Sequence, residues 1–494
     1  MTANQPSLKL KTARTLKWNL IDRFGSQVLY AITGIVLARE LSQEAFGMVG
    51  AILIFQAFAS LLVDSGFSYA LLQRKDPTQQ DYSTVLWFNI IVSVILYGLL
   101  YVSAPFISSL FDNNEALVPL SRVMFLSFII NGTAIVQTNR YMKQMDVRPV
   151  AIANLASLFF GGVVGIWLAV TGWGAWAIVW QTLTFGTIKS VFLWISARWL
   201  PSMTFSWKRL CGFFHVGGAM MFTSFLNTVF LNIYSFFVGN RVGLVALGYY
   251  TQGDKWSKMF VSSLSQVLTS SFIPVLSHVQ DDMPRYNRLA HRMNRMTAYI
   301  TLPIFIGLIV EAKPIFHCLF GEKWDASILL FQLLLFRGIF TVLTGLYSNY
   351  LLSLGYASAI ARLEIWRDII AVVGLVITFP VMDVSTASNP VWGVSIMLWG
   401  QIVAAFVAWL LTLMAVKRKC KLSIKLLLID YLPYALLSVV LGAVMWFIGS
   451  MCQHPWLALV IETLFGLGGY LGMNYLFKSR IQKEAIAYLR GKMQ

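Results

Sequence analysis

The chain has 494 residues, of which 57% are hydrophobic and only 12% are charged, and its mean hydropathy is +0.69. A soluble domain usually carries about 25% charged residues, so this composition excludes a soluble globular protein and predicts a polytopic membrane protein. The formal net charge of +17 could suggest a nucleic-acid-binding protein, but the basic residues are not gathered into a patch with interleaved aromatic residues. An unequal distribution of charge between membrane loops explains the high net charge better.

The first residues, "MTANQPSLKLKTARTLKW", are basic, but Asp22 and Arg23 interrupt the apolar run that follows, and no small-residue cleavage site comes after it. We therefore expect a retained cytosolic segment rather than a signal peptide. Apolar windows of roughly 20 residues then recur along the chain, and no polar block is long enough to fold separately. They predict an all-α fold with about fourteen transmembrane helices, near residues 16–38, 45–69, 82–104, 118–138, 150–171, 174–196, 212–238, 247–275, 296–316, 327–350, 359–381, 391–416, 428–450 and 457–477.

Lysine and arginine are distributed unequally between the two sides of these spans. The termini and the even-numbered connections hold 28 of the 38, the odd-numbered connections hold four, and six lie within spans. The positive-inside rule therefore places both termini in the cytoplasm. A chain of twelve spans that lacks the last pair would give the same result, so the orientation is better determined than the number of spans. The outer connections are short, which excludes an extracytoplasmic catalytic domain.

The sequence contains a weak internal repeat. The stretch "LARELSQEAFGMV" at 37–49 aligns with "VGNRVGLVALGYY" at 238–250, and each closes one span and opens the next, at a constant offset of 201 residues. Six spans separate the two copies, so the halves have the same orientation and would be related by an axis along the membrane normal, as in parallel-repeat transporters. The alternative, which the sequence leaves open, is that both loops simply turn at glycine after an apolar helix.

Three predicted spans carry polar side chains on one helical face. Three such faces predict a wet cavity between helices, because a helix that faces lipid would not need them. The alternative is a helix-packing seam, where serine, threonine and asparagine are common. The stripes are Asn19, Arg23, Ser26, Tyr30 and Thr33 in the first span, Ser224, Asn227, Thr228 and Ser235 in the seventh, and Lys255, Lys258, Ser262, Ser265 and Thr269 in the eighth, where Trp256, Phe260, Leu264 and Leu268 form another face.

Lysines at two stripe positions of the eighth span favour the cavity over the seam. A charge at the centre of a spanning helix costs ~2.5 to 3.5 kcal/mol on insertion scales, so such residues generally face the protein interior and mark a pathway or a pair. Lys255 and Lys258 are therefore expected to form an anion-binding rim near the outer end of the cavity. Asp254 is expected to pair with Lys258 one turn further on.

Other charges lie at comparable depth. Arg23 and Asp64 occupy similar levels of antiparallel neighbouring spans and are candidates for a structural or gating pair, with Asp22 beside them. Arg337, near the middle of the tenth span, has Asp368 as its nearest acid in depth, and a structural pair and a substrate contact are both open. Two further residues lie close enough to span ends for their long stems to reach the membrane surface, namely Lys189 and Arg122.

Nothing in the sequence points to enzymatic chemistry. The four cysteines and five histidines show no disulfide or metal-type spacing, and no glycine-rich phosphate loop ending in Gly-Lys-Ser/Thr occurs. We therefore expect no catalytic residue, no metal and no cofactor, with transport driven by the membrane potential alone or coupled to H⁺ or Na⁺. The candidate gating or ion-coupling residues are Asp22, Asp64, Asp254, Arg337 and Asp368.

Five stretches carry a resemblance to a known family. They are "ARELSQEAFGMVG" after the first span, "DSGFSYALLQRKD" ending the second, "LGYY" opening the eighth, "FIPVLSHVQDD" closing it and "LFGEKW" before the tenth. Together they resemble the Wzx-type polysaccharide flippases of the MOP superfamily, particularly the colanic acid exporter branch. Lipid II flippases and MATE transporters are more distant relatives, and the resemblance covers nearly the whole chain.

The resemblance implies two six-helix lobes, 1–200 and 201–420, around a central cationic cavity, followed by two extra helices and a cytoplasmic tail in 421–494. It implies a multi-pass protein of the bacterial cytoplasmic (inner) membrane that moves a polyprenyl pyrophosphate-linked oligosaccharide from the cytoplasmic to the outer leaflet by alternating access. By position in the sequence, Arg23 and Lys255 match the cationic cavity residues of the family. Lys258 is a candidate because of its place on the polar stripe, not because of a family motif. Around Gln252, where some relatives have a basic residue, this sequence has "YYTQGDKW".

Three other functions are weighed against this one. A MATE-like ion-coupled multidrug antiporter should have acidic cavity residues for cationic drugs, whereas the clearest stripe charges here are lysines. A glycan polymerase or ligase should have catalytic residues on a substantial outer loop, and a scaffold should have packing seams without deep cations. The expected partners are a lipid-linked glycan and the inner membrane but no nucleic acid. We expect a monomer, and association with glycan polymerisation machinery is left open.

Overall fold

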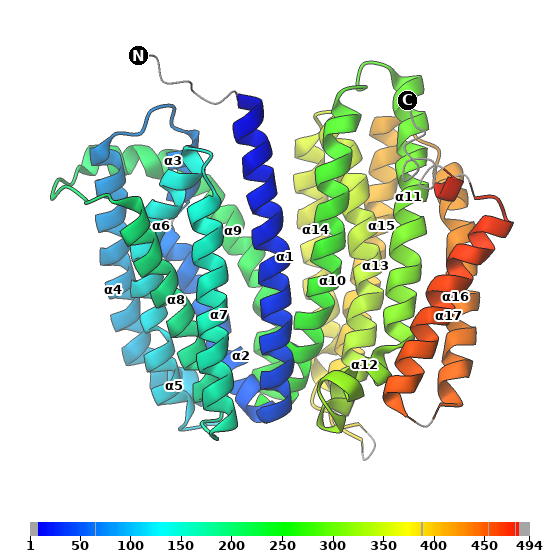
Figure 1. The fold of residues 1–494 in the computed structure, drawn as a ribbon, viewed down its shortest axis with the longest axis horizontal. Coiled ribbons are helices and arrows are strands. Elements are labelled where there is room, and N and C mark those ends of the chain that lie inside the picture. Colours follow the sequence, from blue (N-terminus) through cyan, green and yellow to red (C-terminus); the bar gives the residue numbers. More distant parts are fainter. Residues whose placement is uncertain (1–7, 65, 387–388, 453, 480, 484–494) are drawn as a thin grey trace. The chain divides into compact units, whose positions relative to one another are not determined.

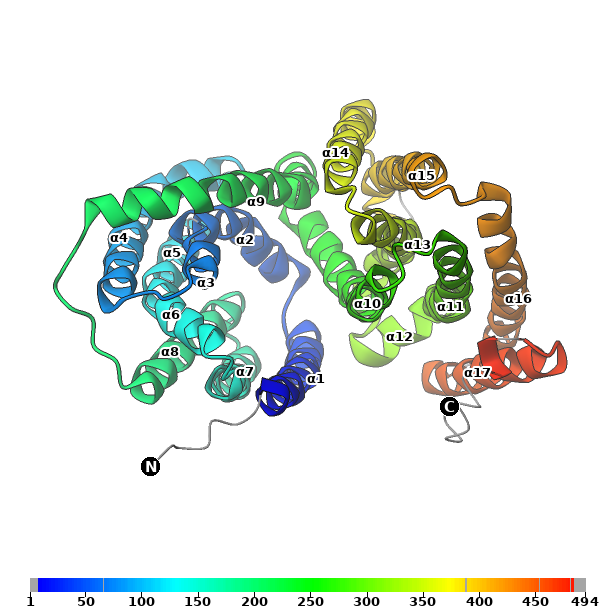
Figure 2. The same ribbon diagram turned by 90° about the horizontal axis from the view of Figure 1, so that it is seen from above.

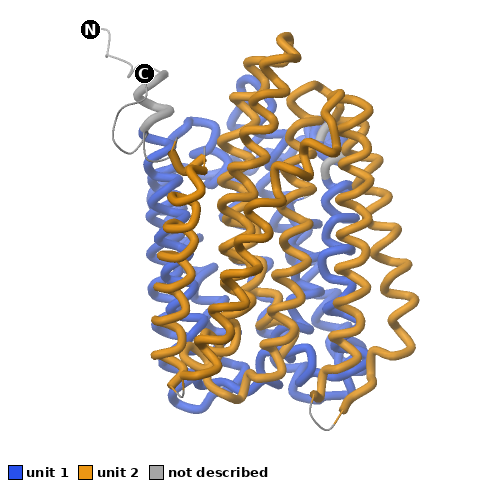
Figure 3. Tube along the Cα trace, turned by 90° about the vertical axis from the view of Figure 1, so that its right-hand side faces the viewer, with its two compact units in different colours: residues 1–248 blue, residues 249–494 orange. Residues whose placement is uncertain are grey.

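A computed structural model describes residues 8–64, 66–386, 389–452, 454–479 and 481–483. Helices are the regular elements throughout this part of the chain, so the predicted all-α fold is confirmed (Figure 1). They form two compact units, residues 1–248 and 249–494, which Figure 3 colours separately. The helices are α1 (Leu8–Glu40), α2 (Gln43–Asp64), α3 (Phe67–Gln73), α4 (Gln79–Ser109), α5 (Leu117–Met124), α6 (Leu126–Lys143), α7 (Arg148–Val170), α8 (Trp176–Ala197), α9 (Trp207–Arg241), α10 (Leu244–Ser277), α11 (Met283–Val310), α12 (Ala312–Leu319), α13 (Asp325–Ser353), α14 (Ala357–Thr378), α15 (Trp392–Cys420), α16 (Ile424–Ser450) and α17 (Pro455–Leu476), with short 3-10 helices at Glu322–Trp324 and Phe379–Val381.

In the described residues, 13 helical segments are long and apolar enough to cross a membrane. They coincide with all the predicted spans except the eleventh, near 359–381. That span corresponds to α14, which has 22 residues but carries four charged residues close together, Arg362, Glu364, Arg367 and Asp368. Because each charge is costly at bilayer depth, α14 fits the membrane less well than its neighbours. The predicted domain boundaries at residues 200 and 420 follow the repeat and stay predictions.

In residues 1–248, α7 packs against α1 and α8, α6 packs against α4 and α8, and α9 packs against α2 and α3 (Figure 2). Glycines on α7 allow the close approach on two sides. A Cβ on Gly165 would lie 3.0 Å from Gln181 Cβ of α8, and one on Gly162 would lie 2.7 Å from Thr33 Oγ1 of α1. Small residues bring helix backbones together in membranes. Thr33, at the end of the predicted first stripe, is therefore a packing residue.

The connections of this unit gather at two opposite ends. At one end, Thr15 Oγ1 near the start of α1 donates to the carbonyl oxygen of Met145, which follows α6, at 2.7 Å. At the other end, Asn114 Nδ2, between α4 and α5, donates to Glu44 Oε1, at the start of α2, at 3.1 Å. The alternation of connections expected for antiparallel spans is thus present in residues 1–248.

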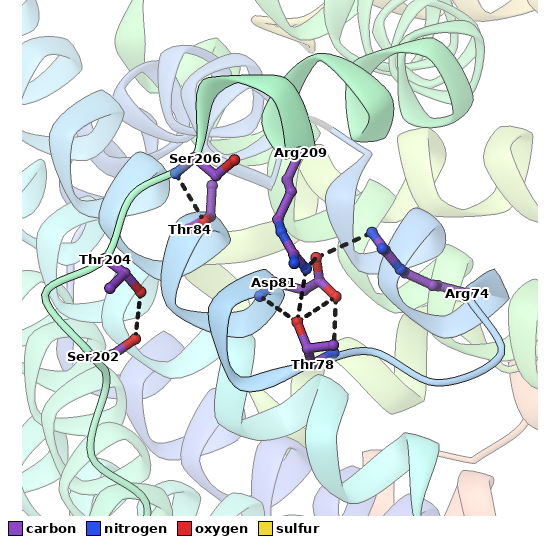
Figure 4. A network of polar contacts seen from close by, with 8 residues as sticks. All are labelled: Arg74, Thr78, Asp81, Thr84, Ser202, Thr204, Ser206 and Arg209. Carbon is purple, nitrogen blue, oxygen red and sulfur yellow. Dashed lines mark hydrogen bonds and ion pairs between the residues drawn. The ribbon is translucent and has the colours of Figure 1, made fainter.

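Asp81, at the start of α4, organises the first of these ends (Figure 4). Its side chain is fully buried, and its Oδ1 accepts from Arg209 Nη1 of α9 at 2.7 Å and from Arg74 Nη1 after α3 at 3.0 Å. Its Oδ2 accepts from the Thr78 backbone N–H at 2.8 Å, while Thr78 Oγ1 accepts from the Asp81 N–H at 3.3 Å. This reciprocal capping box fixes the first turn of α4, and one carboxylate joins three segments of the chain.

The same turns of α4 hold the connection that leads from α8 to α9. Ser202 N–H donates to Ser83 Oγ at 2.9 Å. Ser206 N–H donates to Thr84 Oγ1 at 3.3 Å (Figure 4). Trp87 Nε1 donates to the Ser202 carbonyl at 3.0 Å. These side chains satisfy backbone groups that regular helix bonding leaves open, so the entry of α9 is fixed by α4.

In residues 249–494, α13 packs against α11 and α15, and α16 packs against α11 and α17. The fully buried Tyr350 of α13 donates its hydroxyl to the Ala290 carbonyl of α11 at 2.8 Å. Asp430 of α16 lies 2.6 Å from His291 Nδ1 and accepts from Arg295 Nη1 at 3.0 Å. Both partners belong to α11, so a buried carboxylate again fixes one helix against another.

The two helix breaks of the predicted repeat coincide with the observed boundaries. α1 and α9 end 201 residues apart, and α2 and α10 begin 201 residues apart. The breaks also contact each other reciprocally within residues 1–248. A Cβ on Gly47 would collide with the Leu244 carbonyl oxygen, and a Cβ on Gly248 would collide with that of Gln43. Exchange of equivalent positions is the pattern of a two-fold contact, and it supports the repeat.

The buried Asp81 carboxylate can be tested with Asp81→Asn. Because an amide cannot accept from both guanidinium groups and the Thr78 N–H, we expect the free energy of unfolding to fall by about 2 kcal/mol. Thermal unfolding of the detergent-solubilised protein measures the change. Asp76→Asn, an exposed carboxylate in the same connection, should leave the transition unchanged. Equal effects of the two substitutions would contradict the role given to Asp81.

The reciprocal glycine contact can be tested with Gly47→Ala. We expect this change to destabilise the protein by about 1 to 3 kcal/mol, because the added methyl group overpacks against a backbone carbonyl. Gly98→Ala, in α4, is the matched control, since nothing lies within 4 Å of its Cβ position. It should stabilise the helix by roughly 0.5 to 1 kcal/mol. A stabilising effect of Gly47→Ala in the same thermal assay would show that the contact is absent.

Candidate functional site

α10 separates a buried face from an open face in unit 2. On the buried face Trp256 lies 5.1 Å from the Phe320 ring, centroid to centroid, and Leu268 is also buried. On the open face Lys258 and Ser262 are exposed. These two positions of the predicted polar stripe are therefore not used to pack α10 against its neighbours.

Asp254 and Lys258 form an ion pair one helical turn apart. Lys258 Nζ lies 2.5 Å from Asp254 Oδ2, so the predicted pair is confirmed. The Asp254 side chain is only 12% exposed, whereas that of Lys258 is 46% exposed. Pairs of this kind on helix surfaces contribute only about 0.3 to 0.5 kcal/mol. The ammonium group is thus oriented by a fixed carboxylate but held weakly, and a stronger anion can replace that partner.

Lys255 lies one turn before Lys258 and is half-buried. Its Nζ is 5.5 Å from the centroid of the Trp256 ring, a distance at which the ring face attracts a cation. The helix begins at Leu244, 11 residues before Lys255 and 14 before Lys258, which corresponds to rises of about 16 and 21 Å. The two ammonium groups therefore lie three to four turns inside α10, and the anion-binding rim that they were predicted to form stays a prediction.

The remainder of the stripe is divided between two roles. Thr269 Oγ1 accepts from Asn349 Nδ2 of α13 at 3.2 Å, so this position is part of a packing seam. Ser262 Oγ donates to the carbonyl of Met259 in its own helix at 3.4 Å, and Ser265 is half-buried. Packing positions and open positions thus share one stripe.

α1 carries a polar cluster in unit 1. Asp22 Oδ1 accepts from Ser26 Oγ at 3.2 Å, and Asp22 Oδ2 accepts from Asn154 Nδ2 of α7 at 3.1 Å. Lys189 of α8 lies with its Nζ 5.8 Å from the Phe185 ring centroid. The predicted reach of its stem to the membrane surface stays a prediction.

Arg23, next to this cluster, is half-buried and has no hydrogen bond or ion pair with any residue that the structure describes. The predicted pair with Asp64 is wrong. Asp64 Oδ1 accepts from Ser68 Oγ at 2.5 Å, and Ser68 Oγ accepts from Asn139 Nδ2 at 2.8 Å. The chain turns after α2 at Gly66, whose φ is 69°, and this turn brings Ser68 onto the carboxylate.

The predicted pair of Arg337 and Asp368 is also not formed. Arg337 Nη1 donates to Gln401 Oε1 of α15, and Asp368 Oδ1 accepts from Nε and Nη2 of the adjacent Arg367 at 3.0 and 2.9 Å. The helix packed most extensively against α13 is α15 rather than α14, which gives Arg337 a different neighbour from the one expected. A substrate contact of Arg337 stays a prediction.

The first and seventh predicted stripes keep several open positions. Asn19 and Tyr30 of α1 are exposed, as is Asn227 of α9. Thr228 Oγ1, beside Asn227, donates to the carbonyl of Ser224 in the same helix at 2.8 Å. Some polar side chains on these faces thus form hydrogen bonds within their own helix, whereas others are exposed. The cavity interpretation and the packing-seam interpretation of the stripes hold at different positions.

Sequence analysis missed the amide partners of these clusters. Asn154 and Asn349 are each the one amide residue within largely apolar stretches, "AIANLASLFF" and "GLYSNYLLS". An isolated amide at membrane depth is a signal that a partner lies on a neighbouring helix. Identifying that partner requires knowledge of which helices are neighbours, and the periodicity of one helix does not contain it.

These features define a class: a polytopic α-helical membrane protein with two units, in each of which a spanning helix carries a charged and hydrogen-bonding face. The comparisons with known proteins narrow this class. The chain belongs to the polysaccharide biosynthesis protein family, whose model matches residues 36–329.

Curated relatives match about two thirds or more of the chain. The teichuronic acid biosynthesis protein TuaB of Bacillus subtilis (strain 168) is 26% identical over 358 residues, which cover 71% of this chain and 73% of TuaB. The succinoglycan biosynthesis transport protein ExoT of Rhizobium meliloti (strain 1021) is 24% identical over 68% of each chain. The lipopolysaccharide biosynthesis protein WzxC of Escherichia coli (strain K12) is 21% identical over 67% of this chain and 68% of its own.

Solved structures share the fold. The lipid II flippase MurJ in an inward closed conformation matches with a TM-score of 0.70 and 17% identity, over 94% of this chain and 98% of MurJ. An inward-facing multidrug resistance MATE family transporter of the MOP superfamily matches with a TM-score of 0.57 and 18% identity, over 79% and 95%. The predicted relation to polysaccharide biosynthesis proteins is therefore confirmed at the level of the family, and the fold is shared with these two solved structures.

The open face of α10 can be tested with cysteine labelling in permeabilised membranes. In a background with Cys211→Ser and Cys452→Ser, we expect Ser262→Cys to react with a charged methanethiosulfonate, because the reactive thiolate forms only where water solvates it. Leu268→Cys, on the buried face, should remain unmodified. Mass spectrometry of the intact protein measures the modification. A face covered by lipid or by another helix would leave both positions unreacted.

Proposed function

We propose that this protein is a flippase that moves a polyprenyl pyrophosphate-linked oligosaccharide from the cytoplasmic to the outer leaflet of a bacterial cytoplasmic membrane. The observation that carries the proposal is the half-exposed Lys258 ammonium group, three to four turns inside a spanning helix, in a chain of the polysaccharide biosynthesis family. The relatives described above act in teichuronic acid, succinoglycan and lipopolysaccharide biosynthesis. Three different polymers favour recognition of a shared lipid diphosphate over recognition of one sugar.

The chemistry of α10 suits such a substrate. A lipid-linked diphosphate carries about two negative charges, and hydrogen bonds to charged groups contribute about 1.5 to 3 kcal/mol each. Lys258 can exchange the single carboxylate oxygen of Asp254 for phosphate oxygens, since its present pair is weak. Asp254 then acts as the resting partner that orients Lys258 when no substrate is bound. Ser262 and Ser265 follow on the same stripe and offer hydroxyl groups to sugars.

Arg23 in unit 1 is the second cation that we assign to the substrate. It has no hydrogen bond or ion pair in the described part of the chain, and a half-buried guanidinium group without an anion is costly at membrane depth. Guanidinium groups bind phosphate in a bidentate manner. Arg23 is therefore proposed as a contact of unit 1 for the diphosphate during alternating access.

The orientation and the driving force belong to the same proposal. Both termini are assigned to the cytoplasm because 28 of 38 lysines and arginines lie on that side of the predicted spans. With the inside negative, outward movement of two negative charges gains ~2.3 kcal/mol per charge per 100 mV. The potential therefore favours export. We further propose that the protein acts as a monomer, and its association with glycan polymerisation machinery is a separate question.

A MATE-like multidrug antiporter is the second candidate function. The observation in its favour is Asp22, a membrane-depth carboxylate held by Asn154. The charge of Lys189 acts on that carboxylate, so a cationic drug bound there would be repelled by an ammonium group. Deletion of the gene should therefore leave resistance to cationic drugs unchanged while surface polysaccharide is lost.

The cationic site can be tested with Lys255→Ala and Arg23→Ala. We expect each to lower glycan export by about 10-fold or more, because each removes a charged contact of about 1.5 to 3 kcal/mol. Surface polysaccharide in cells, or accessibility of the lipid-linked glycan on the outer leaflet, provides the measurement. Lys75→Ala, an exposed lysine in a connection, is the control for net charge, and membrane abundance of every variant is checked by immunoblot. Full export in both single variants and in the double variant would remove the proposal.

A further inference from the structure

Two glutamates are buried together at one end of unit 2. Glu311 lies between α11 and α12, and Glu462 lies in the third turn of α17. Their exposed fractions are 8% and 4%. Because α11 ends and α17 begins at the same end of the unit (Figure 1), residues 151 positions apart in sequence meet there. Neither residue belongs to the polar stripes or to the candidate cation site.

The contacts of the two carboxyl groups are unequal. Glu311 Oε1 accepts from Thr463 Oγ1 at 2.9 Å. Glu462 has no hydrogen bond with any described residue, and its Oε2 is fully buried. The charges of the two glutamates interact with each other. The Glu462 carboxyl group lies against the backbone of α16 at Gly449, where a Cβ would collide with Oε1. The fold therefore contains a space shaped for this carboxyl group and provides it with no donor.

The surrounding elements offer no compensating cation. The last two turns of α11 and of α16 contain no charged residue. On α12, Lys313 is exposed and His317 Nε2 lies 2.7 Å from Asp325 Oδ1. His454, before α17, is exposed, and Cys452, after α16, is bonded to a backbone carbonyl of that helix. None of these groups forms an ion pair with either glutamate in the described structure.

Two carboxylates in such a place cannot both be ionised. Desolvation disfavours each negative charge, and each charge disfavours the other, so paired buried carboxyl groups retain a proton that isolated ones would lose. Burial raises the pKa of the Glu311 carboxyl group, and the hydrogen bond from Thr463 opposes that rise. By contrast, Asp22, Asp64 and Asp254 each have a hydrogen-bond donor or an ammonium partner.

We propose that Glu311 and Glu462 form a proton-binding site, in which the pair holds one proton at neutral pH. The ligand is the proton itself, and the site is separate from the cations assigned to the substrate, so it does not depend on the proposed function. The folded state binds this proton more tightly than the unfolded chain does. Stability from the pair is therefore present at low pH and is lost as the pH rises above the ordinary range of a glutamate.

Infrared spectroscopy of the purified protein in lipid at pH 7 tests the proposal directly. The wild type is expected to show the carbonyl stretch of a buried, protonated carboxylic acid, and Glu462→Gln is expected to remove that band. Glu322→Gln, an exposed glutamate before α13, makes the same change in charge and should keep the band. Glu311→Gln provides a second variant if Glu462→Gln does not fold. A band that survives substitution of either member of the pair overturns the proposal.

The pH dependence of stability gives an independent measurement. Between pH 6 and pH 9 we expect the Tm of the wild type to fall by more than that of Glu462→Gln, because the amide has no proton to lose. Glu322→Gln should follow the wild type. Equal slopes in the wild type and Glu462→Gln would refute the site. A rise in the wild-type Tm at pH 9 on replacing N-methylglucamine with Na⁺, absent in Glu462→Gln, would also overturn the proton assignment in favour of a sodium site.

Discussion

An ionised side chain removed from water requires an opposite charge or a hydrogen-bonding shell, and this requirement shapes the polar structure of both units. Three carboxylates, of which Asp81 and Asp430 are buried, meet it by joining different helices. Asp81 binds two arginines from separate segments, Asp430 joins α16 to two side chains of α11, and Asp22 is held by the amide of Asn154. Breaking a buried pair leaves an uncompensated charge, so each of these contacts also fixes which helices are neighbours.

The candidate substrate site meets the same requirement in a different way. Asp254 and Lys258 satisfy each other within one helix, so their pairing fixes no other element. Because the pair is local and partly exposed, it can open without disturbing the packing of α10, whose other face is held by Trp256 and Leu268. Contacts between helices suit a static scaffold, whereas a local pair suits a site that must bind and release an anion.

The glutamates at the end of α11 and in α17 are the exception, because they have neither a cation nor a full set of donors. A proton is the remaining way to remove the charge, and a proton can leave and return without any movement of the backbone. In the functions proposed above, the cations of α1 and α10 and this carboxyl pair would therefore serve different ligands. The fold keeps them on different elements, so a change in protonation need not alter the binding of the anion.

Fold similarity to MurJ at 17% identity fits a fold in which helix length and hydropathy, rather than particular side chains, specify the elements. Particular residues matter where backbones approach closely. Gly47 and Gly248 allow the two helix breaks of the repeat to touch, and Gly449 makes room for a carboxyl group. Such contacts account for few positions in the chain, yet they determine how neighbouring helices pack.

The sequence by itself determined the helical class, nearly all the spans, the position of the repeat breaks and the pair of Asp254 with Lys258. These features depend on hydropathy and on spacings within one turn or one span, which a linear chain displays directly. The tertiary structure alone decided that Asp64 bonds Ser68, that Arg337 meets Gln401 and that Glu311 lies beside Glu462. Each of these contacts depends on which helices are neighbours and on how each is rotated, and the period of a single helix carries neither quantity. The pairs of Arg23 and Arg337 were predicted from similar depth in the membrane. Similar depth is necessary for contact, but it does not determine how a helix is rotated or which helix is its neighbour.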